Sequence, residues 1–276
     1  MILKFKEYKS YAKINLFLHI VGKKDNGFHK LQTYFQLIDL YDTIKIKPSV
    51  TTKIITHNQQ IKMADNLVYK AFNLWQKTTR CLQNVRIEIN KNIPAGAGLG
   101  GASSNAAIAL IALNEMFSTN LSQQELLKMA LKIGADVSIF IKKQSAFAEG
   151  TGEIITPHNL PQQNYLLIYP NLHISTKQVF SNLKLTKFTK RVNISAFFDF
   201  KNSRNDCLQS ALDAYPQMIE NFSLINQLIK DFKLNTQAKL TGTGSSIFIA
   251  IPDKKTGIKM LPHLPISWFC QVVSSL

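Results

Sequence analysis

Cysteine is scarce in this chain, and no pattern joins the three that it has. Cys81, Cys207 and Cys270 are odd in number, far apart and outside any C-x-x-C spacing. Neither a disulfide framework nor a cysteine zinc site is indicated. We therefore expect a reducing compartment and no dedicated metal site.

Long hydrophobic runs are also absent. No segment approaches the roughly 18 uninterrupted apolar residues of a membrane-spanning helix. Residues 1–11 carry lysines, and no apolar stretch with a small-residue cleavage site follows them. The expectation is a cytoplasmic protein with no membrane partner.

Acidic residues are few, since 17 Asp and Glu stand against 33 Lys and Arg and the net charge is +16. Such a chain attracts phosphates, nucleotides or nucleic acid. The lysines occur singly and in pairs rather than in the runs typical of nucleic-acid tails, so most of them are interpreted as a solvated surface. A hydrophobic content of 45% argues against disorder.

Periodicity predicts a mixture of strands and helices. Apolar and polar residues alternate from Ala12 to Ile20, which predicts a strand with Lys13 and Asn15 side by side on its polar face. Ser122 and Glu125 form a capping box that opens a helix, and Gly134 is predicted to end it as a C′ glycine. The other predicted strands are 33–37, 43–47, 85–89, 165–169 and 247–251, and the other predicted helices are 66–77, 105–117, 206–215 and 220–232.

These elements do not follow a strict strand–helix–strand order, so an α+β protein is favoured over a doubly wound sheet. Prolines begin to interrupt shorter strands beyond about residue 156. The sequence thus predicts two domains, residues 1–156 and 157–276.

The strongest chemical signal is the glycine segment from Pro94 to Ser104. Four glycines fall within the six residues from Gly96 to Gly101, and two serines follow just before the predicted helix. Glycines let backbone N–H groups converge on one anion, and a helix N-terminus adds its positive dipole end. The alternative is a plain turn or linker, but so dense a glycine run is costly for a connector.

Two better-known glycine loops fit less well. A Walker A loop needs Gly-Lys-Ser/Thr where this chain has Gly100, Gly101 and Ala102, and the formal G-x-G-x-x-G match to a dinucleotide-binding turn is weak alone. The paired serines and the upstream Lys13 favour a kinase, which needs donors around a triphosphate and hydroxyls near its metal.

The segment Pro94–Ala107 resembles the ATP loop of GHMP kinases. Further segments resemble, in order, the diphosphocytidyl-methylerythritol kinase branch of that superfamily: residues 12–16, 27–32, 65–67, 134–137, 149–152 and 241–246. One departure is Phe28, where the branch more often has Tyr. Phenylalanine keeps the aromatic face for stacking on cytosine and loses only a hydroxyl.

The resemblance implies residue roles. Asp136 would be the base for the substrate hydroxyl, although an Asp before a short helix is more commonly an N-cap. Lys13 would lie near Asp136 and neutralise charge on the transferred group. ATP would bind with Mg²⁺ at Asp65, Asn66, Lys91, Pro94, Ala95, Gly96, Ala97, Gly98, Leu99, Gly100, Gly101, Ala102, Ser103 and Ser104. The cytidine diphosphate-linked methylerythritol would bind at Asn15, Phe28, His29, Thr176, Phe180, Gly242, Thr243 and Gly244.

The fold implied is the two-domain GHMP kinase fold, with an N-terminal ribosomal-protein-like domain, a C-terminal ferredoxin-like domain and the active site in the cleft between them. The implied partners are small molecules, without nucleic acid, and the protein would be a monomer or weak homodimer. Three alternatives remain at this point: a GHMP kinase for mevalonate, homoserine or a sugar, a basic nucleic-acid-binding protein, and an inactive homologue.

Overall fold

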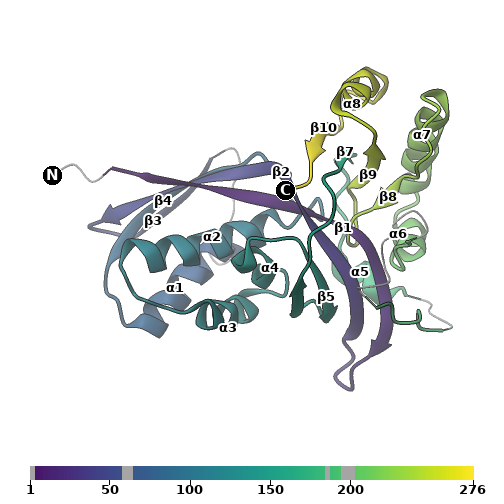
Figure 1. Ribbon diagram of the computed structural model, residues 1–276. Helices are drawn as coiled ribbons and strands as arrows, with labels where there is room; N and C mark the ends of the chain where they lie inside the picture. The colour runs from purple at the N-terminus through teal and green to yellow at the C-terminus, as the bar shows by residue number, and fades with distance from the viewer. Residues whose placement is uncertain (1–3, 58–64, 184–186, 194–202) are drawn as a thin grey trace. The chain divides into compact units, whose positions relative to one another are not determined.

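The computed structural model describes residues 4–57, 65–183, 187–193 and 203–276. The chain, whose helices and strands are labelled in Figure 1, forms two compact units that are not consecutive in sequence. Unit 1 comprises residues 1–12, 40–95 and 100–144, and unit 2 comprises residues 13–39, 96–99 and 145–276. The first two strands and the glycine loop therefore contribute residues to both units, and the division at residue 156 stays a prediction.

Unit 1 joins strands to a group of helices. It contains the first part of β1 (Lys6–Lys23), the second part of β2 (His29–Ser49), β3 (Lys53–His57) and β4 (Asn84–Asn90). β4 pairs antiparallel with β2 and parallel with β3. The helices are α1 (Leu67–Thr79), α2 (Gly101–Met116), α3 (Gln123–Ile133) and α4 (Val137–Lys142).

The helices of unit 1 differ in how they are buried. α1 is amphipathic and buries one stripe that includes Phe72 and Trp75, as the 3.6-residue period requires. α2 is apolar on nearly every side, and its residues 104–110 are all buried. A helix of that kind is stable only inside the core, which places the end of the glycine loop on a rigid support.

Unit 2 contains two sets of strands. The first part of β2 pairs antiparallel with β5 (Ala146–Gly150), which pairs antiparallel with β6 (Ile154–Pro157). A second, antiparallel sheet has the order β10-β7-β9-β8. Its strands are β7 (Asn164–Tyr169), β8 (Lys239–Leu240), β9 (Ile247–Ile251) and β10 (Phe269–Ser274).

The helical elements of unit 2 pack on the second sheet. They are α5 (Thr176–Ser181), α6 (Leu208–Ala214), α7 (Gln217–Asp231), α8 (Lys254–Met260) and the 3₁₀ turn η4 (Leu261–His263). Apolar side chains of β7 and β9 share one buried cluster with those of α6, α7 and α8, including Ile168, Ile249 and Leu228. The β1 residues Leu18 and Ile20 belong to the same cluster, so the strand that carries Lys13 is anchored in a core.

Two predicted boundaries are wrong, and although α3 ends before Gly134 as predicted, the predicted conformation of Gly134 is wrong. The strands predicted at 33–37 and 43–47 are one strand, β2. The acidic residues between them do not interrupt it, because Asp39 and Asp42 accept hydrogen bonds from backbone N–H groups of other segments. The helix predicted from Asn105 begins at Gly101, so Ser103 and Ser104 lie inside its first turn. Gly134 has an extended backbone (φ 177°) rather than the left-handed conformation of a C′ glycine.

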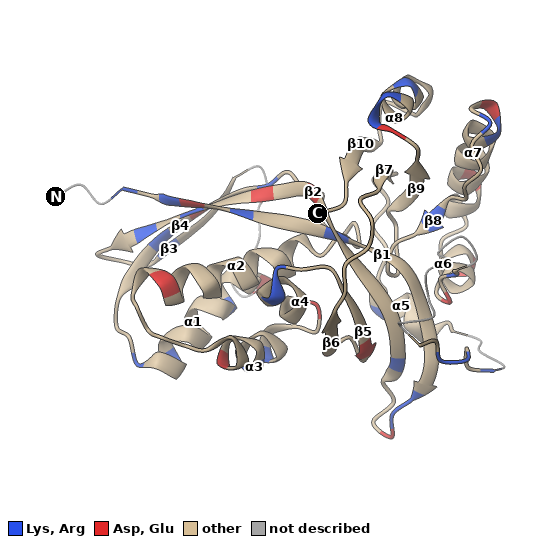
Figure 2. Cartoon of the chain, in the orientation of Figure 1, with Lys and Arg blue, Asp and Glu red and all other residues tan. Residues whose placement is uncertain are grey.

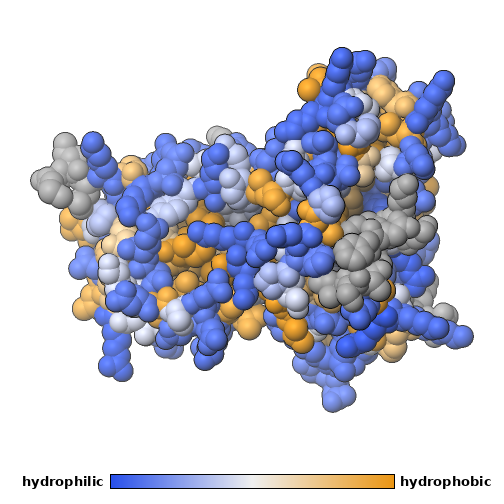
Figure 3. Space-filling model, viewed as in Figure 1, coloured by the Kyte–Doolittle hydropathy of each residue, from blue (hydrophilic) through white to orange (hydrophobic). Residues whose placement is uncertain are grey.

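The other predicted elements are confirmed within three residues, except that the strand predicted from Ala12 begins at Lys6. Ser122 and Glu125 form the predicted capping box at the start of α3. Figure 3 shows hydrophobic residues interspersed among hydrophilic ones on the visible face. Among the residues that the structure describes, no helix is long and apolar enough to cross a membrane.

Candidate active site

Lys13 and Asn15 form the centre of a buried polar network in unit 2. Each residue is only 3% exposed. The Lys13 ammonium donates to Asn15 Oδ1 (2.7 Å) and to the carbonyl of Gly98 (2.9 Å), and it lies 5.4 Å from the centre of the Phe35 ring. A buried ammonium needs such acceptors because its desolvation is costly. The strand prediction that put these two polar side chains together is confirmed.

The third glycine segment, residues 241–246, joins this network. Thr241 Oγ1 accepts from the backbone N–H of Asn15 (2.8 Å). Gly242 has a positive φ of 60°, and a Cβ there would lie 3.4 Å from Asn15 Oδ1 and 3.7 Å from Lys13 Nζ. These distances are ordinary van der Waals contacts, so it is the left-handed backbone that explains why glycine occupies this position.

The glycine loop meets the same segment. A Cβ on Gly98 would lie 2.8 Å from the carbonyl oxygen of Gly244 and 3.1 Å from that of Thr241. The backbone N–H of Ser246 donates to the carbonyl of Ala97 (3.4 Å). The residues through which the two glycine segments meet are 143 or more apart in sequence, and they are packed backbone to backbone beside Lys13.

The loop has the conformation of an anion-binding turn. Gly96, Gly98 and Gly100 all have φ between 67° and 75°, while Ala97 and Leu99 between them are buried. Alternation of this kind turns successive backbone N–H groups toward one concave side. Gly100 leads directly into α2, whose first N–H groups have no partner within the helix.

Aromatic side chains lie at the predicted substrate side of unit 2. His29 stacks on Phe180 with ring centroids 5.6 Å apart and an angle of 25°. Burial and then the nearby Lys23 charge lower the pKa of His29, so its imidazole is neutral at pH 7. Phe28 is 64% exposed, and Thr176 shares a hydrogen bond with Thr243 (2.9 Å).

Known proteins match this chain over almost its full length. The family of the GHMP kinase N-terminal domain matches residues 66–144. The 4-diphosphocytidyl-2-C-methyl-D-erythritol kinase of Ruthia magnifica subsp. Calyptogena magnifica is 38% identical, over 96% of this chain and 93% of its own. The enzyme of that name from Francisella tularensis subsp. tularensis (strain WY96-3418) is 43% identical, over 91% of this chain and 90% of its own. The chain belongs to the 4-diphosphocytidyl-2-C-methyl-D-erythritol kinase family.

A solved structure agrees with this family assignment. A crystal structure of 4-(cytidine 5'-diphospho)-2C-methyl-D-erythritol kinase superposes with a TM-score of 0.82 at 25% identity, covering 97% of this chain and 99% of that one. The predicted GHMP kinase fold is confirmed, and the chain is an enzyme of the kinase class that uses ATP as phosphoryl donor. The resemblance drawn from the motifs is also confirmed.

Asp136, the predicted base in this kinase family member, stands in unit 1 just before α4. It occupies the N-cap position, but its side chain makes no capping hydrogen bond. The common structural explanation for an Asp at this position therefore does not apply here. The predicted proximity of Asp136 to Lys13 stays a prediction.

Three of the predicted nucleotide residues have side-chain hydrogen bonds or ion pairs in unit 1. Asn66 caps α1 by accepting from the backbone N–H of Val68 (2.9 Å). Lys91 is ion-paired with the buried Asp42, while Asp65 is exposed just before the Asn66 cap. Ser104 Oγ accepts from Ser10 Oγ at 2.7 Å, and Ala102 is exposed in the first turn of α2.

Sequence reasoning missed several residues of this network. Thr33 accepts from the Asn15 amide (2.8 Å) and donates to the carbonyl of Phe17 (2.5 Å). Asn205 donates to the carbonyls of Leu240 and Gly242 (2.9 and 2.7 Å). Neither belongs to a recognisable motif, so only the folded chain identifies them. Asp42, in a separate cluster in unit 1, is another residue that sequence reasoning missed.

Proposed function

We propose that this kinase transfers the γ-phosphoryl group of ATP to the 2-hydroxyl of 4-diphosphocytidyl-2-C-methyl-D-erythritol, giving the 2-phosphate and ADP in the methylerythritol phosphate route to isoprenoid precursors. The observation that carries the proposal is the network in which Lys13 and Asn15 meet both glycine segments. The relatives from Ruthia magnifica and Francisella tularensis and the solved structure, which bear the name of this activity, support the choice of substrate.

The substrate would bind in unit 2. Phe28 and Phe180 would flank the cytosine ring, and the exposed face of Phe28 is available for stacking. A neutral His29 has one N–H donor and one acceptor nitrogen, which suits the edge of a cytosine. Thr176, Thr243 and Asn15 would contact the methylerythritol part, with Gly242 and Gly244 leaving room for it.

The glycine loop, Pro94–Ser104, would hold the phosphates of ATP. Its left-handed glycines and the N-terminus of α2 supply backbone donors, which hold phosphate oxygens well. Asp65 and Asn66 are proposed for the nucleoside end. Mg²⁺ bound to the phosphates would offset their negative charge. Mg²⁺ in such sites is held largely by phosphate and water, so it would need few protein ligands.

Asp136 would accept the proton of the 2-hydroxyl as its oxygen attacks the γ-phosphorus and the bond to the β-phosphate oxygen breaks. Lys13 would balance the negative charge on the transferred group. Because Lys13 is already held by Asn15 and Gly98, its ammonium needs no rearrangement at the moment of reaction.

We further propose that the enzyme acts on small molecules without a nucleic-acid partner, as a monomer or weak homodimer in the cytoplasm. The two-domain division at residue 156 also remains our proposal. A GHMP kinase for mevalonate, homoserine or a sugar is not favoured, because the Phe28–His29 turn would then have no base to bind.

The test is ADP release by the purified protein with Mg·ATP and four acceptors: 4-diphosphocytidyl-2-C-methyl-D-erythritol, mevalonate, homoserine and galactose. Release with the cytidine substrate alone supports the proposal. Release with another acceptor would leave a GHMP kinase with a different substrate, and release with none would contradict the proposed activity.

A further inference from the structure

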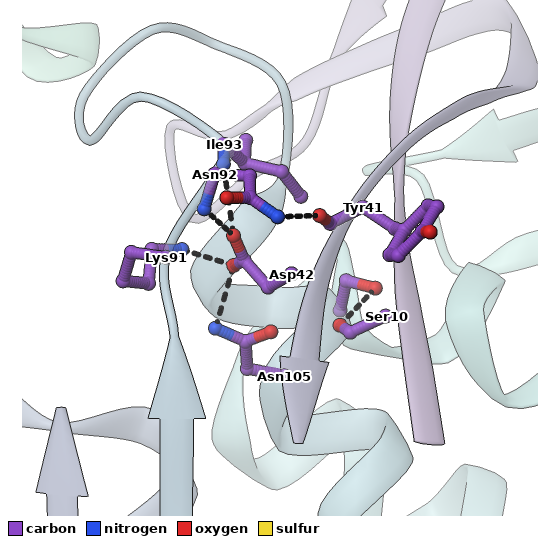
Figure 4. Close-up of polar contacts among 8 residues, drawn as sticks. Ser10, Tyr41, Asp42, Lys91, Asn92, Ile93 and Asn105 are labelled. Atoms are coloured by element: carbon purple, nitrogen blue, oxygen red, sulfur yellow. Dashed lines mark hydrogen bonds and ion pairs between the residues drawn. The ribbon is translucent and has the colours of Figure 1, made fainter. Parts of the chain in front are cut away.

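Asp42 is a fully buried carboxylate that no motif identifies. It lies within β2 and is 0% exposed. Four donors reach it (Figure 4): the Lys91 ammonium, the backbone N–H groups of Asn92 and Ile93 (both 2.8 Å) and the Asn105 side-chain amide (2.9 Å). An ionised carboxylate has about four acceptor sites, so Asp42 is saturated.

A buried charge of this kind is stable only while its partners remain. The Lys91 side chain is itself only 10% exposed, so both charges of the pair have left water. Removing one partner would leave an uncompensated charge in the interior. The sequence and fold therefore hold these five residues in one arrangement.

The partners of Asp42 stand on both sides of the glycine loop. Lys91, Asn92 and Ile93 directly precede Pro94, where the loop begins, and Asn105 lies in α2, which follows the loop. One carboxylate thus holds the segment that enters the loop and the helix that leaves it. In Figure 4 the Asn92 and Ile93 amides and the Asn105 amide approach Asp42 from these two elements.

Gly101 shows how tightly the two sides are packed. A Cβ on Gly101 would lie 2.9 Å from Ile93 Cγ2 and 3.2 Å from Lys91 Nζ. The first residue of α2 therefore rests directly on the segment that Asp42 holds. Any movement of Lys91 or Ile93 would be passed to the N-terminal turn of the helix.

We propose that Asp42 is a positioning residue for the nucleotide loop, and that Lys91 acts through Asp42 rather than by touching a phosphate. The proposal rests on the proposed function only in that the loop binds ATP. Asp42 spaces the loop ends so that the backbone donors of the loop and of α2 point at the same anion. Because Asp42 is fully buried, it would act without touching either substrate.

The experiment compares Asp42→Asn, Lys91→Met and the double variant with Asp39→Asn as matched control. Asp39 is a carboxylate in the same strand, but it is paired with Lys254 and accepts from the backbone N–H of Ser274. Affinity for a fluorescent non-hydrolysable ATP analogue and for the cytidine substrate is measured separately. Hydrogen exchange is followed at the amides of residues 92–104.

Asp42→Asn and Lys91→Met should each lower the affinity for the ATP analogue by roughly tenfold or more. The affinity for the cytidine substrate should be unchanged. The double variant should bind the analogue at least as tightly as the single variant with the lower affinity, because both residues act through one contact. Exchange at Asn92 and Ile93 should be faster in Asp42→Asn and unchanged in Asp39→Asn.

Multiplied losses in the double variant would show that Lys91 contacts the nucleotide itself and would overturn its assignment. Unchanged analogue affinity and unchanged exchange in Asp42→Asn would overturn the role of Asp42. Asn105→Ala, which keeps the Asp42–Lys91 pair, serves as a second variant if Asp42→Asn does not fold. It should also lower the affinity for the ATP analogue, and an unchanged affinity would overturn the proposal. Failure of the cytidine substrate to react, with analogue binding intact in the wild type, would contradict the proposed function alone.

Discussion

Lys13 and Asp136, the two residues proposed for phosphoryl transfer, have different surroundings. Lys13 is 3% exposed and donates to Asn15 and Gly98, so it contributes to the packing of unit 2 as well as to the proposed chemistry. Asp136 is half-buried and makes no capping bond to α4. Substitution of Asp136 should therefore separate catalysis from stability more cleanly than substitution of Lys13.

Asp136→Ala should lower turnover by about 10²–10⁴-fold, the usual contribution of a positioned general base. Affinity for ATP and the melting temperature should change little, because the side chain is half-buried and makes no capping hydrogen bond to α4. The measurements are kcat by ADP release, nucleotide titration and thermal unfolding, with Asp231→Asn at the exposed end of α7 as control. Turnover close to that of the wild type would remove Asp136 from the mechanism.

Phe28→Ala should raise the KM for the cytidine substrate by roughly tenfold, since an aromatic pair contributes about 0.5–1.5 kcal/mol beyond the area that it buries. The KM for ATP should stay the same. Stability should also be unaffected, because Phe28 is 64% exposed without ligand. Phe28→Tyr serves as the conservative control and should bind like the wild type. An unchanged KM in Phe28→Ala would exclude stacking at this position.

The turn that presents Phe28 is held by the connection between β5 and β6. The backbone N–H of Lys24 donates to the carbonyl of Phe28 (2.7 Å), and its ammonium pairs with Glu153 (3.0 Å). Burial acts to raise the pKa of Glu153, but hydrogen bonds from its own backbone, Lys24 and Thr151 outweigh it and lower the pKa to about 2. The hairpin end is thus fixed by an ionised carboxylate.

Glu153→Gln should lower the free energy of unfolding by about 1 kcal/mol at pH 7, a modest value because the pair is partly exposed. A lowered carboxyl pKa gives stability that is complete above the unfolded value of 4.5 and is lost as the pH falls toward 2. The difference from wild type in urea unfolding should therefore shrink between pH 5 and pH 2. Lys24→Met should destabilise in the same way at pH 7, and an equal difference at pH 7 and pH 2.5 would contradict the assignment.

Local periodicity was sufficient for most elements but not for their connections. Two local patterns, the alternation around Lys13 and Asn15 and the capping box at Ser122, involve only residues close together in the chain. They can therefore be predicted from the sequence alone. Thr241, by contrast, meets Asn15 across 226 residues, and Asp42 meets Asn105 across 63. Such partners are set by the tertiary fold. This is also why β2 continues through Asp42, where local reasoning placed a break.

The chain as a whole carries a charge of +16, and its distribution bears on function. Figure 2 shows Lys and Arg on strands and helices of both units, not gathered on one element. Some of the few acidic groups are engaged in ion pairs within the protein, as Asp42 is with Lys91 and Glu153 is with Lys24. The excess of positive charge is therefore a general field around the molecule, and the two proposed substrates are both polyanions.

A field of this kind accelerates the encounter with anions and is screened by salt, because the Debye length falls from about 10 Å at 0.1 M to about 3 Å at 1 M. The ratio kcat/KM for both substrates should fall several-fold between roughly 0.05 and 0.5 M NaCl, whereas kcat at saturation should hold, since Lys13 is buried. Steady-state kinetics across that range, with a glycerol series to control for viscosity, measures both. A salt-independent kcat/KM would show that the charge has no part in substrate capture. A parallel loss of kcat would instead indicate that salt disturbs the buried network around Lys13.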